Sequence, residues 1–184
     1  TILVEKFIKG KHYRLLVVGD KMVAASLRLA AHVIGDGIRT IEELIEKENS
    51  ENPLRGEDHE KPLTKIVVDK IVEAYLKKQN KTLQYVPKKD EIVYLRENDN
   101  LSTGGIAIDV TENVHPVNAN LAVMAAKVIG LDIAGVDITV SDISIALDRA
   151  NGAVIEINAA PGIRMHHFPS QGKGRNVAGE IIRL

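Results

Sequence analysis

The sequence predicts an α+β protein in which a β-rich core is interrupted by a small helical insertion. Two strand-like apolar runs flank a turn near the start, and two segments with helical spacing of apolar residues follow it. The last third alternates between helix-like and strand-like patterns. We expect the core to comprise residues 1–31 and 96–184, and the insertion to comprise residues 32–95.

Composition narrows the class of protein. A chain of 184 residues suits one domain, or one domain with an insertion, and 45% hydrophobic residues suffice for a core. Aromatic residues make up only 3%, so aliphatic side chains must fill that core. A net charge of -1 argues against nucleic acid or an anionic membrane as partner, and the absence of Cys excludes disulfides and thiolate metal sites. With neither a signal peptide nor a membrane-length apolar run, the sequence predicts a cytoplasmic location.

The first element is a hairpin spanning Tyr13 to Leu29, with Gly19, Asp20 and Lys21 at its turn. Its strands are nearly continuous in apolar residues, which predicts burial on much of both faces.

The insertion contains two predicted helices and a strand. Thr40 and Glu43 form a capping box at the start of the first helix, and Asp69 to Asn80 is the second. The strand covers Glu91 to Glu97. The apolar stripe expected on the second helix consists of Ile71, Val72, Tyr75 and Leu76.

The last third begins with an amphipathic helix from His115, which Gly130 ends. Strands are predicted at Asp132 to Asp142 and at Ala153 to Asn158. The core-facing residues expected on the helix are Leu121, Met124, Ala125 and Val128.

Polar residues interrupt the last two strands. Glu156 and Asn158 lie two apart and share one strand face, whereas Ile155 and Ile157 share the other and can be buried. If the preceding strand is a neighbour, its Asp137 joins them on that face. Carboxylate and amide oxygens are ligands that Mg²⁺ prefers, so the pattern indicates a metal site. A half-exposed strand with a hydrated polar face explains the same alternation.

A second candidate segment is the Ser-Thr-Gly-Gly sequence at 102–105, which follows Asn98, Asp99 and Asn100. Such a loop can offer backbone N–H groups and hydroxyls to an anion. Such a segment is more often simply a turn, here before the strand Ile106 to Val110.

The combination of an Asp on one strand with Glu-x-Asn and Pro-Gly on the next resembles the metal end of the ATP-grasp fold. Along nearly the whole chain the sequence is similar to the cyanophycin synthetase family, most specifically in "NLSTGG" and "NAAPGIRMH". This implies the C-terminal half of an ATP-grasp domain: an antiparallel β-sheet with helices, carrying residues 32–95 as a lid. Because an apolar run begins at once and without Met, we expect a piece of a longer protein, inactive alone, that also has a first ATP-grasp half and a Mur-ligase-like domain.

The resemblance implies an ATP-dependent carboxylate–amine ligase. Such an enzyme activates the C-terminal carboxylate of a poly-aspartate backbone as an acyl phosphate and adds L-aspartate, while a separate domain adds arginine. Its cofactors are ATP and two Mg²⁺ ions, and its partners are aspartate, arginine and a cyanophycin primer. We also expect a homo-oligomer.

The implied ligand set is carried over residue by residue. Asp137 and Glu156 would hold one Mg²⁺, and Glu156 and Asn158 the second. Glu5 and the backbone at Ile8 match the segment that receives adenine, and His12 stands where the superfamily often has an acidic ribose contact.

The other implied residues surround the phosphate and the substrates. Arg14 and Arg28 would face phosphate or a carboxylate, although structural salt bridges explain them too. Residues matching the loop that positions the acceptor carboxylate and the transferred phosphate are Ser102, Thr103, Gly104 and Gly105. Those following the Pro-Gly turn, where related ligases bind the incoming substrate, are Arg164, His166 and His167. An exposed loop is the alternative for the last three.

Two other interpretations stay open. The ATP-grasp half of a bifunctional glutathione synthetase shares the "GDG" and "STGG" segments, but "EINAAPGIRMH" favours the cyanophycin synthetase family. A non-catalytic binding or oligomerisation module is the second.

Overall fold

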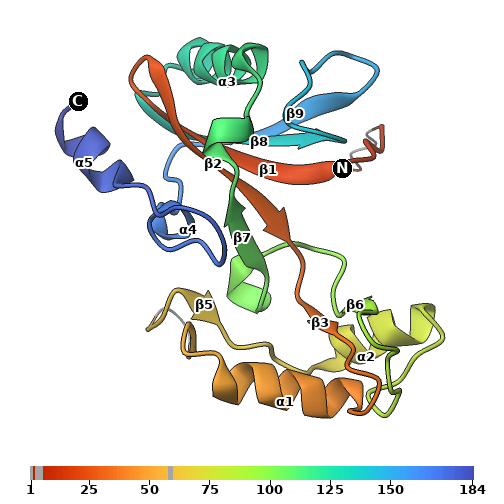
Figure 1. Cartoon of the computed structure of the whole chain (residues 1–184). Helices are drawn as coiled ribbons and strands as arrows, with labels where there is room; N and C mark the ends of the chain where they lie inside the picture. The colour runs from red at the N-terminus through yellow and green to blue at the C-terminus, as the bar shows by residue number, and fades with distance from the viewer. Residues whose placement is uncertain (1, 3–5, 58–59) are drawn as a thin grey trace. The chain divides into compact units, whose positions relative to one another are not determined.

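The computed structural model describes residues 2, 6–57 and 60–184, and these form two compact units (Figure 1). The sheet unit comprises Thr1–Leu27 and Ile108–Leu184, and the insertion unit comprises Arg28–Ala107. The predicted insertion, residues 32–95, lies within the second unit. No helix of the described ranges is both long and apolar enough to cross a membrane.

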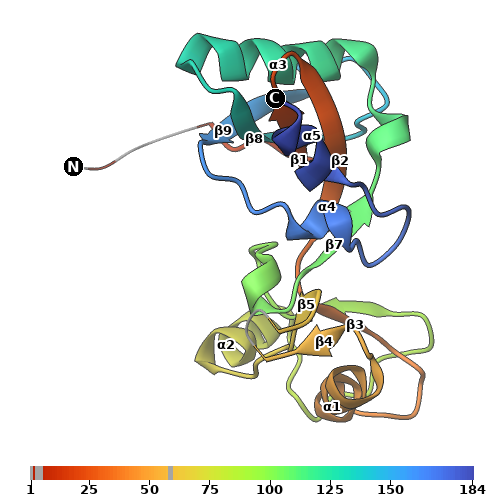
Figure 2. The ribbon, with the colours of Figure 1, turned by 90° about the vertical axis from the view of Figure 1, so that its left-hand side faces the viewer.

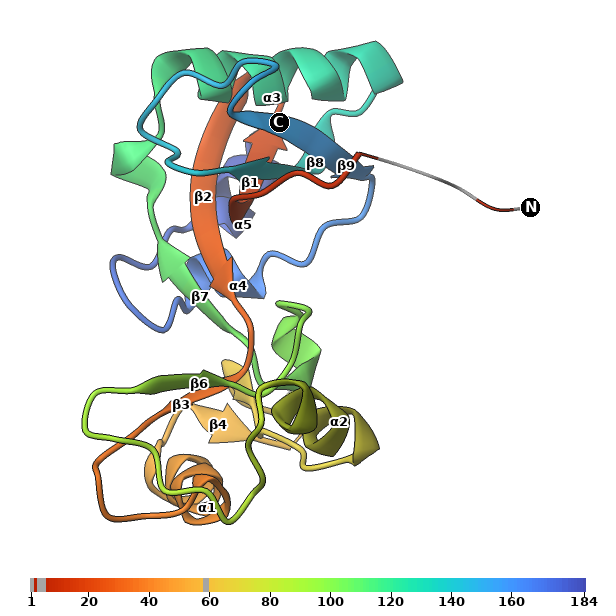
Figure 3. The same ribbon diagram turned by 90° about the vertical axis from the view of Figure 1, so that its right-hand side faces the viewer.

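A five-stranded sheet in the order β7-β2-β1-β8-β9 forms the sheet unit's framework (Figure 3). β1 and β8 are antiparallel, as are β8 and β9, which confirms the antiparallel architecture. The predicted hairpin is confirmed, with Gly19 in the left-handed region at φ 57°. The strands are β1 (Lys11–Val18), β2 (Lys21–Leu29), β7 (Ile106–Asp109), β8 (Ile133–Val140) and β9 (Gly152–Asn158).

Helices cover both faces of this sheet (Figure 2). On one face α3 (Pro116–Ile129) packs on alternate residues of β1, including Leu15 and Val17. On the other face Leu16 and Val18 of β1 pack against α5 (Val177–Ile182). This two-sided cover explains why residues 13–18 are all buried, as predicted for the hairpin.

The predicted core face of α3 is confirmed for Ala125, which packs against the core, and is wrong for Met124 and Val128. Met124 and Val128 are 62% and 83% exposed, whereas Ala122 and Ala126 are fully buried. Small side chains allow the helix backbone to approach the sheet closely, so the Ala face packs inward and the larger apolar residues point outward. Gly130 ends the helix in the left-handed conformation, as predicted.

The predicted burial of Ile155 is also wrong. The β8–β9 register shifts between Asp137 and Ile138, so that Ile155 is the extra residue of a β-bulge and is 57% exposed. The bulge places Val154 and Ile157 on the core side together, although they are three residues apart.

The insertion unit has its own core, formed by two helices against a small sheet (Figure 3). Ile41 and Ile45 of the first helix and Val72 and Leu76 of the second pack on Val33 of the sheet. The elements are β3 (His32–Ile34), α1 (Ile41–Glu51), β4 (Arg55–Gly56), β5 (Leu63–Thr64), α2 (Lys70–Lys78) and β6 (Ile92–Tyr94).

Sequence prediction of this unit was right at the helix starts and less so on the helix surface. The capping box of Thr40 and Glu43 is present, and Asp69 caps α2. Ile71, predicted in the stripe of α2, is 58% exposed, and Tyr75 is only partly buried. Three short helices complete the chain: η1 (Leu101–Thr103), η2 (Thr111–Asn113) and α4 (Arg164–His167).

Candidate functional site

Sheet register aligns three charged side chains in one row across the sheet unit. β1 places Arg14 opposite Asp137 of β8, and β8 places Asp137 opposite Glu156 of β9. Asn158, two residues further along, lies opposite Gly135. The expectation that the two strands are neighbours, with these oxygen donors on one face, is thereby confirmed.

The centre of the row is a buried ion pair. Arg14 Nε donates to one carboxylate oxygen of Asp137 and Nη2 to the other, at 2.9 Å for the second bond. Both residues are under 9% exposed, so each charge depends on the other. Gly135 makes room for this guanidinium, because a Cβ there would lie 3.0 Å from Arg14 Cδ.

The donor set of the row suits a hard cation. The amide nitrogen of Asn158 donates to the Gly135 carbonyl at 3.4 Å, so its nitrogen is used within the sheet. The Glu156 side chain is exposed, whereas both carboxylate oxygens of Asp137 accept hydrogen bonds from Arg14. Within the described ranges, no group of three or more His, Cys, Asp or Glu could hold a metal ion, and the row itself offers two carboxylates and one amide.

His166 lies beside this row rather than in an exposed loop. His166 is 2% exposed, and its Nδ1 lies 3.0 Å from the hydroxyl of Ser26. Burial and, to a smaller extent, the nearby Arg14 charge lower the pKa of His166 to about 4. The ring is therefore neutral at pH 7. A polar core position of this kind was not foreseen from its place after a Pro-Gly turn.

A second polar cluster in the sheet unit escaped sequence prediction. Arg175 Nη2 donates to Asp109 at 2.7 Å, and Arg175 Nη1 donates to Glu112 at 2.7 Å. Burial raises the pKa of Asp109, but hydrogen bonds from Arg175 and Thr111 outweigh it and hold that pKa below its usual value. The sequence signal that could have predicted this cluster is Asp109, an acidic residue between Ile108 and Val110 in an apolar strand.

The insertion unit holds Arg28 and the Ser-Thr-Gly-Gly loop. Arg28 Nε lies 3.0 Å from an oxygen of Asp99, and both side chains are largely buried. This ion pair anchors the segment that leads into η1. Both arginines predicted to face phosphate or a carboxylate therefore have a carboxylate partner within the protein.

The Ser-Thr-Gly-Gly loop is a tight 3₁₀ turn. The N–H groups of Thr103 and Gly105 donate to the Asn100 carbonyl at 3.2 Å, and that of Gly104 donates to Leu101 at 3.2 Å. These three groups are therefore used inside the loop. Among the hydrogen bonds of the described residues, none uses the Ser102 hydroxyl.

The remaining predicted residues are scattered within the sheet unit. Glu5 lies outside the described residues, Ile8 is partly buried before β1, and His12 is exposed at the start of β1. Arg164 begins α4. His167 accepts a hydrogen bond from the Ala178 N–H at 3.1 Å and so supports the start of α5.

Comparison with known proteins agrees with this architecture. The family described as the RimK-like ATP-grasp domain matches residues 63–184. The chain is 53% identical over all 184 residues to a cyanophycin synthetase of Synechocystis sp. and 52% identical to one of Crocosphaera subtropica, in each case covering 21% of that protein. The chain thus spans about a fifth of the length of these curated relatives.

Glutathione enzymes are also similar. The chain is 41% identical over 184 residues to a glutathione biosynthesis bifunctional protein of Clostridium perfringens. It covers 24% of the length of that protein. The crystal structure of a bifunctional glutathione synthetase from Pasteurella multocida matches 96% of the chain and 24% of that protein, with a TM-score of 0.82 and 37% identity. Since the family match covers more than half of the sequence, the chain belongs to the RimK-like ATP-grasp family.

Proposed function

We propose that the chain is part of an ATP-dependent carboxylate–amine ligase of the cyanophycin synthetase type. The enzyme transfers the γ-phosphoryl group of ATP to the C-terminal carboxylate of a poly-aspartate backbone, which releases ADP. The α-amine of L-aspartate then attacks the acyl phosphate, so that a peptide bond forms and inorganic phosphate leaves. The observation that carries the proposal is the row of Asp137 and Glu156 with Asn158 beside it, which joins three oxygen donors on one sheet face.

In this proposal Asp137, Glu156 and Asn158 would hold Mg²⁺, for which the family resemblance implies two ions. The ions neutralise the triphosphate and the charge that develops during phosphoryl transfer. Asp137 is oriented for its part by the two hydrogen bonds from Arg14, which fix the plane of its carboxylate.

The insertion unit contributes a polar group to the transfer. The Ser102 hydroxyl lies on a turn whose own amides are satisfied internally, so its position is well determined. We assign the Ser102 hydroxyl to the acceptor carboxylate or the transferred phosphate, whereas Thr103, Gly104 and Gly105, proposed from the resemblance for the same role, form the turn that holds it. Protein side chains need to form no covalent intermediate, because positioning and charge stabilisation supply the catalysis.

Aspartate, arginine and a cyanophycin primer are the proposed partners of the whole protein, which we expect to be a homo-oligomer. Identities of 50–53% to cyanophycin synthetases favour this specificity over glutathione synthesis, at 41–43%. The glutathione enzymes remain the second candidate, because a solved structure of one has the same fold over 96% of the chain.

The test uses the gene product that carries this chain. ADP release is measured with Mg²⁺ and ATP, once with aspartate and a cyanophycin primer and once with γ-glutamylcysteine and glycine. We expect release only with the first pair, and its loss in Glu156→Gln. The matched control is Glu180→Gln, which should keep full activity. Glu180 is an exposed acid on α5 that forms an ion pair with Arg183 at 2.7 Å. Release with the second pair alone would assign the protein to glutathione synthesis.

A further inference from the structure

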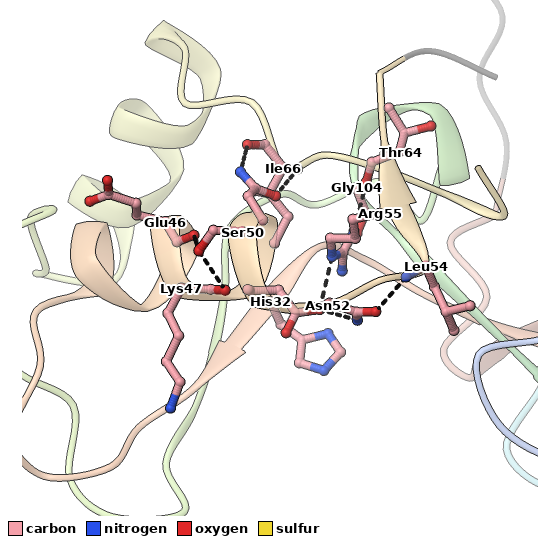
Figure 4. A network of polar contacts seen from close by, with 12 residues as sticks. His32, Glu46, Lys47, Ser50, Asn52, Leu54, Arg55, Thr64, Ile66 and Gly104 are labelled. Carbon is pink, nitrogen blue, oxygen red and sulfur yellow. Dashed lines mark hydrogen bonds and ion pairs between the residues drawn. The ribbon is translucent and has the colours of Figure 1, made fainter. Parts of the chain in front are cut away.

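Arg55 of the insertion unit is an arginine buried at the base of the Ser-Thr-Gly-Gly loop (Figure 4). It is 3% exposed. Its Nη1 donates to the Gly104 carbonyl at 3.2 Å and to the Thr64 carbonyl at 2.7 Å, and its Nε donates to Glu48 Oε1 at 2.8 Å. One guanidinium thus joins α1, β5 and the loop.

The Glu48 carboxylate in turn is held in place. It accepts a second hydrogen bond from the Asn52 amide at 2.9 Å, at the end of the same helix. The carboxylate therefore meets the guanidinium in a fixed position, and the orientation of the Arg55 fork follows from it.

Gly104 is fixed from its other side as well. It has φ of 97°, and a Cβ there would lie 2.9 Å from Ile66 Cγ1. Asn49 of α1 holds Ile66 through both backbone groups: the Asn49 amide donates to the Ile66 carbonyl at 2.9 Å, and the Ile66 N–H donates to Asn49 at 2.8 Å. Adjacent residues of α1, Glu48 and Asn49, therefore support the two groups that contact Gly104.

Burying a charged group costs free energy of desolvation, which its contacts in the folded protein must offset. A second buried arginine of the same unit shows what an ordinary structural role looks like. Arg96, 4% exposed, donates to Asp69 at 2.7 Å and to the Val67 carbonyl at 3.3 Å, and both contacts secure the start of α2. Arg55 differs in that it reaches the candidate phosphate and carboxylate loop.

We propose that Arg55 is a positioning residue for the ligase reaction. By holding the Gly104 carbonyl it fixes the loop that carries the Ser102 hydroxyl, and it acts on the reaction only through that loop. The inference rests on the proposed function for its catalytic part, whereas its structural part stands on the contacts of Arg55 alone.

The test compares Arg55→Lys with Arg96→Lys in the gene product that carries this chain. Lysine keeps the charge but cannot reach three acceptors in a planar fork. For Arg55→Lys we expect faster amide hydrogen exchange at residues 101–105, a rise in KM for the carboxylate substrate and a fall in kcat of about tenfold to 10²-fold, as loop misplacement predicts. The KM for ATP should stay unchanged. Arg96→Lys should speed exchange at α2 and leave both the loop and kcat as in the wild type.

The proposal is overturned if loop exchange in Arg55→Lys equals that of the wild type, or if both variants lower kcat equally. Should Arg55→Lys fail to fold, Glu48→Gln provides the second variant. Glutamine keeps the size of the side chain but removes the negative charge that faces Arg55 Nε. Glu48→Gln should therefore give the same changes to a smaller extent. Loop exchange equal to that of the wild type in Glu48→Gln would overturn the proposal. An inactive wild type with the predicted exchange pattern would contradict the proposed function and leave the positioning by Arg55 supported.

Discussion

The two units position their candidate residues by different means. In the sheet unit, the backbone pairing of three strands places Arg14, Asp137 and Glu156 in one row. In the insertion unit, a turn is held from outside by a buried guanidinium on the Gly104 carbonyl and by the packing of Ile66. A row set by register tolerates the loss of one exposed member, whereas a turn held by side chains depends on each contact.

The largest expected effect is a difference in stability between substitutions at two residues of the row, Asp137 and Glu156. Asp137→Asn leaves Arg14 buried without a charged partner, so we expect the free energy of unfolding to fall by about 3 kcal/mol. Glu156→Gln changes an exposed side chain, so its free energy of unfolding should change by less than about 0.5 kcal/mol. Both variants should lose ADP release. Urea denaturation measures the first difference, and equal destabilisation of the two variants would contradict the row as described.

The turn of the insertion unit is tested by Gly104→Ala. This substitution combines a left-handed backbone with a close approach to Ile66, so we expect a loss of about 2 to 3 kcal/mol in the free energy of unfolding. The matched control is Gly130→Ala, at φ of 80° with nothing within 4 Å of the added Cβ, which should cost only about 1 kcal/mol. Equal losses measured by urea denaturation would mean that Ile66 does not restrain the turn.

Acid should weaken the sheet unit through His166. Its folded pKa of about 4 lies below the ordinary value of 6.5, so the unfolded state binds more protons between these pH values. Stability is therefore full above about pH 6.5 and is lost as pH falls towards 4, by about 2 kcal/mol at pH 5. The groups that act on the ring are Arg14, Asp109 and His167.

Unfolding free energies at pH 7 and pH 5 measure this effect. His166→Asn should remove most of the difference between the two pH values, whereas His167→Asn, a partly buried ring, should keep it. A pH difference that survives in His166→Asn would assign the acid sensitivity to carboxylates such as Asp109.

Features that depend on local geometry could be predicted from the sequence, whereas features that depend on packing between elements could not. Period-two alternation was sufficient to place Glu156 and Asn158 on one face, because strand geometry is local. The bulge at Ile155 was not predictable, since it depends on the fit of β9 to β8. Arg55 lies in a charged, turn-rich segment that resembles solvated surface, and its burial arises only when α1 and η1 fold against it.

The outer face of α3 gives the smallest expected effect and tests the misjudged amphipathicity directly. Val128 is 83% exposed, so Val128→Lys should change the free energy of unfolding by less than about 0.5 kcal/mol. Ala126→Val on the buried face adds volume against the sheet and should cost about 1 to 3 kcal/mol. If apolar surface on α3 drives self-association, Val128→Lys should also lower the mass measured by light scattering. If Val128→Lys destabilises the protein as much as Ala126→Val does, Val128 is a core residue, as the helical pattern alone predicts.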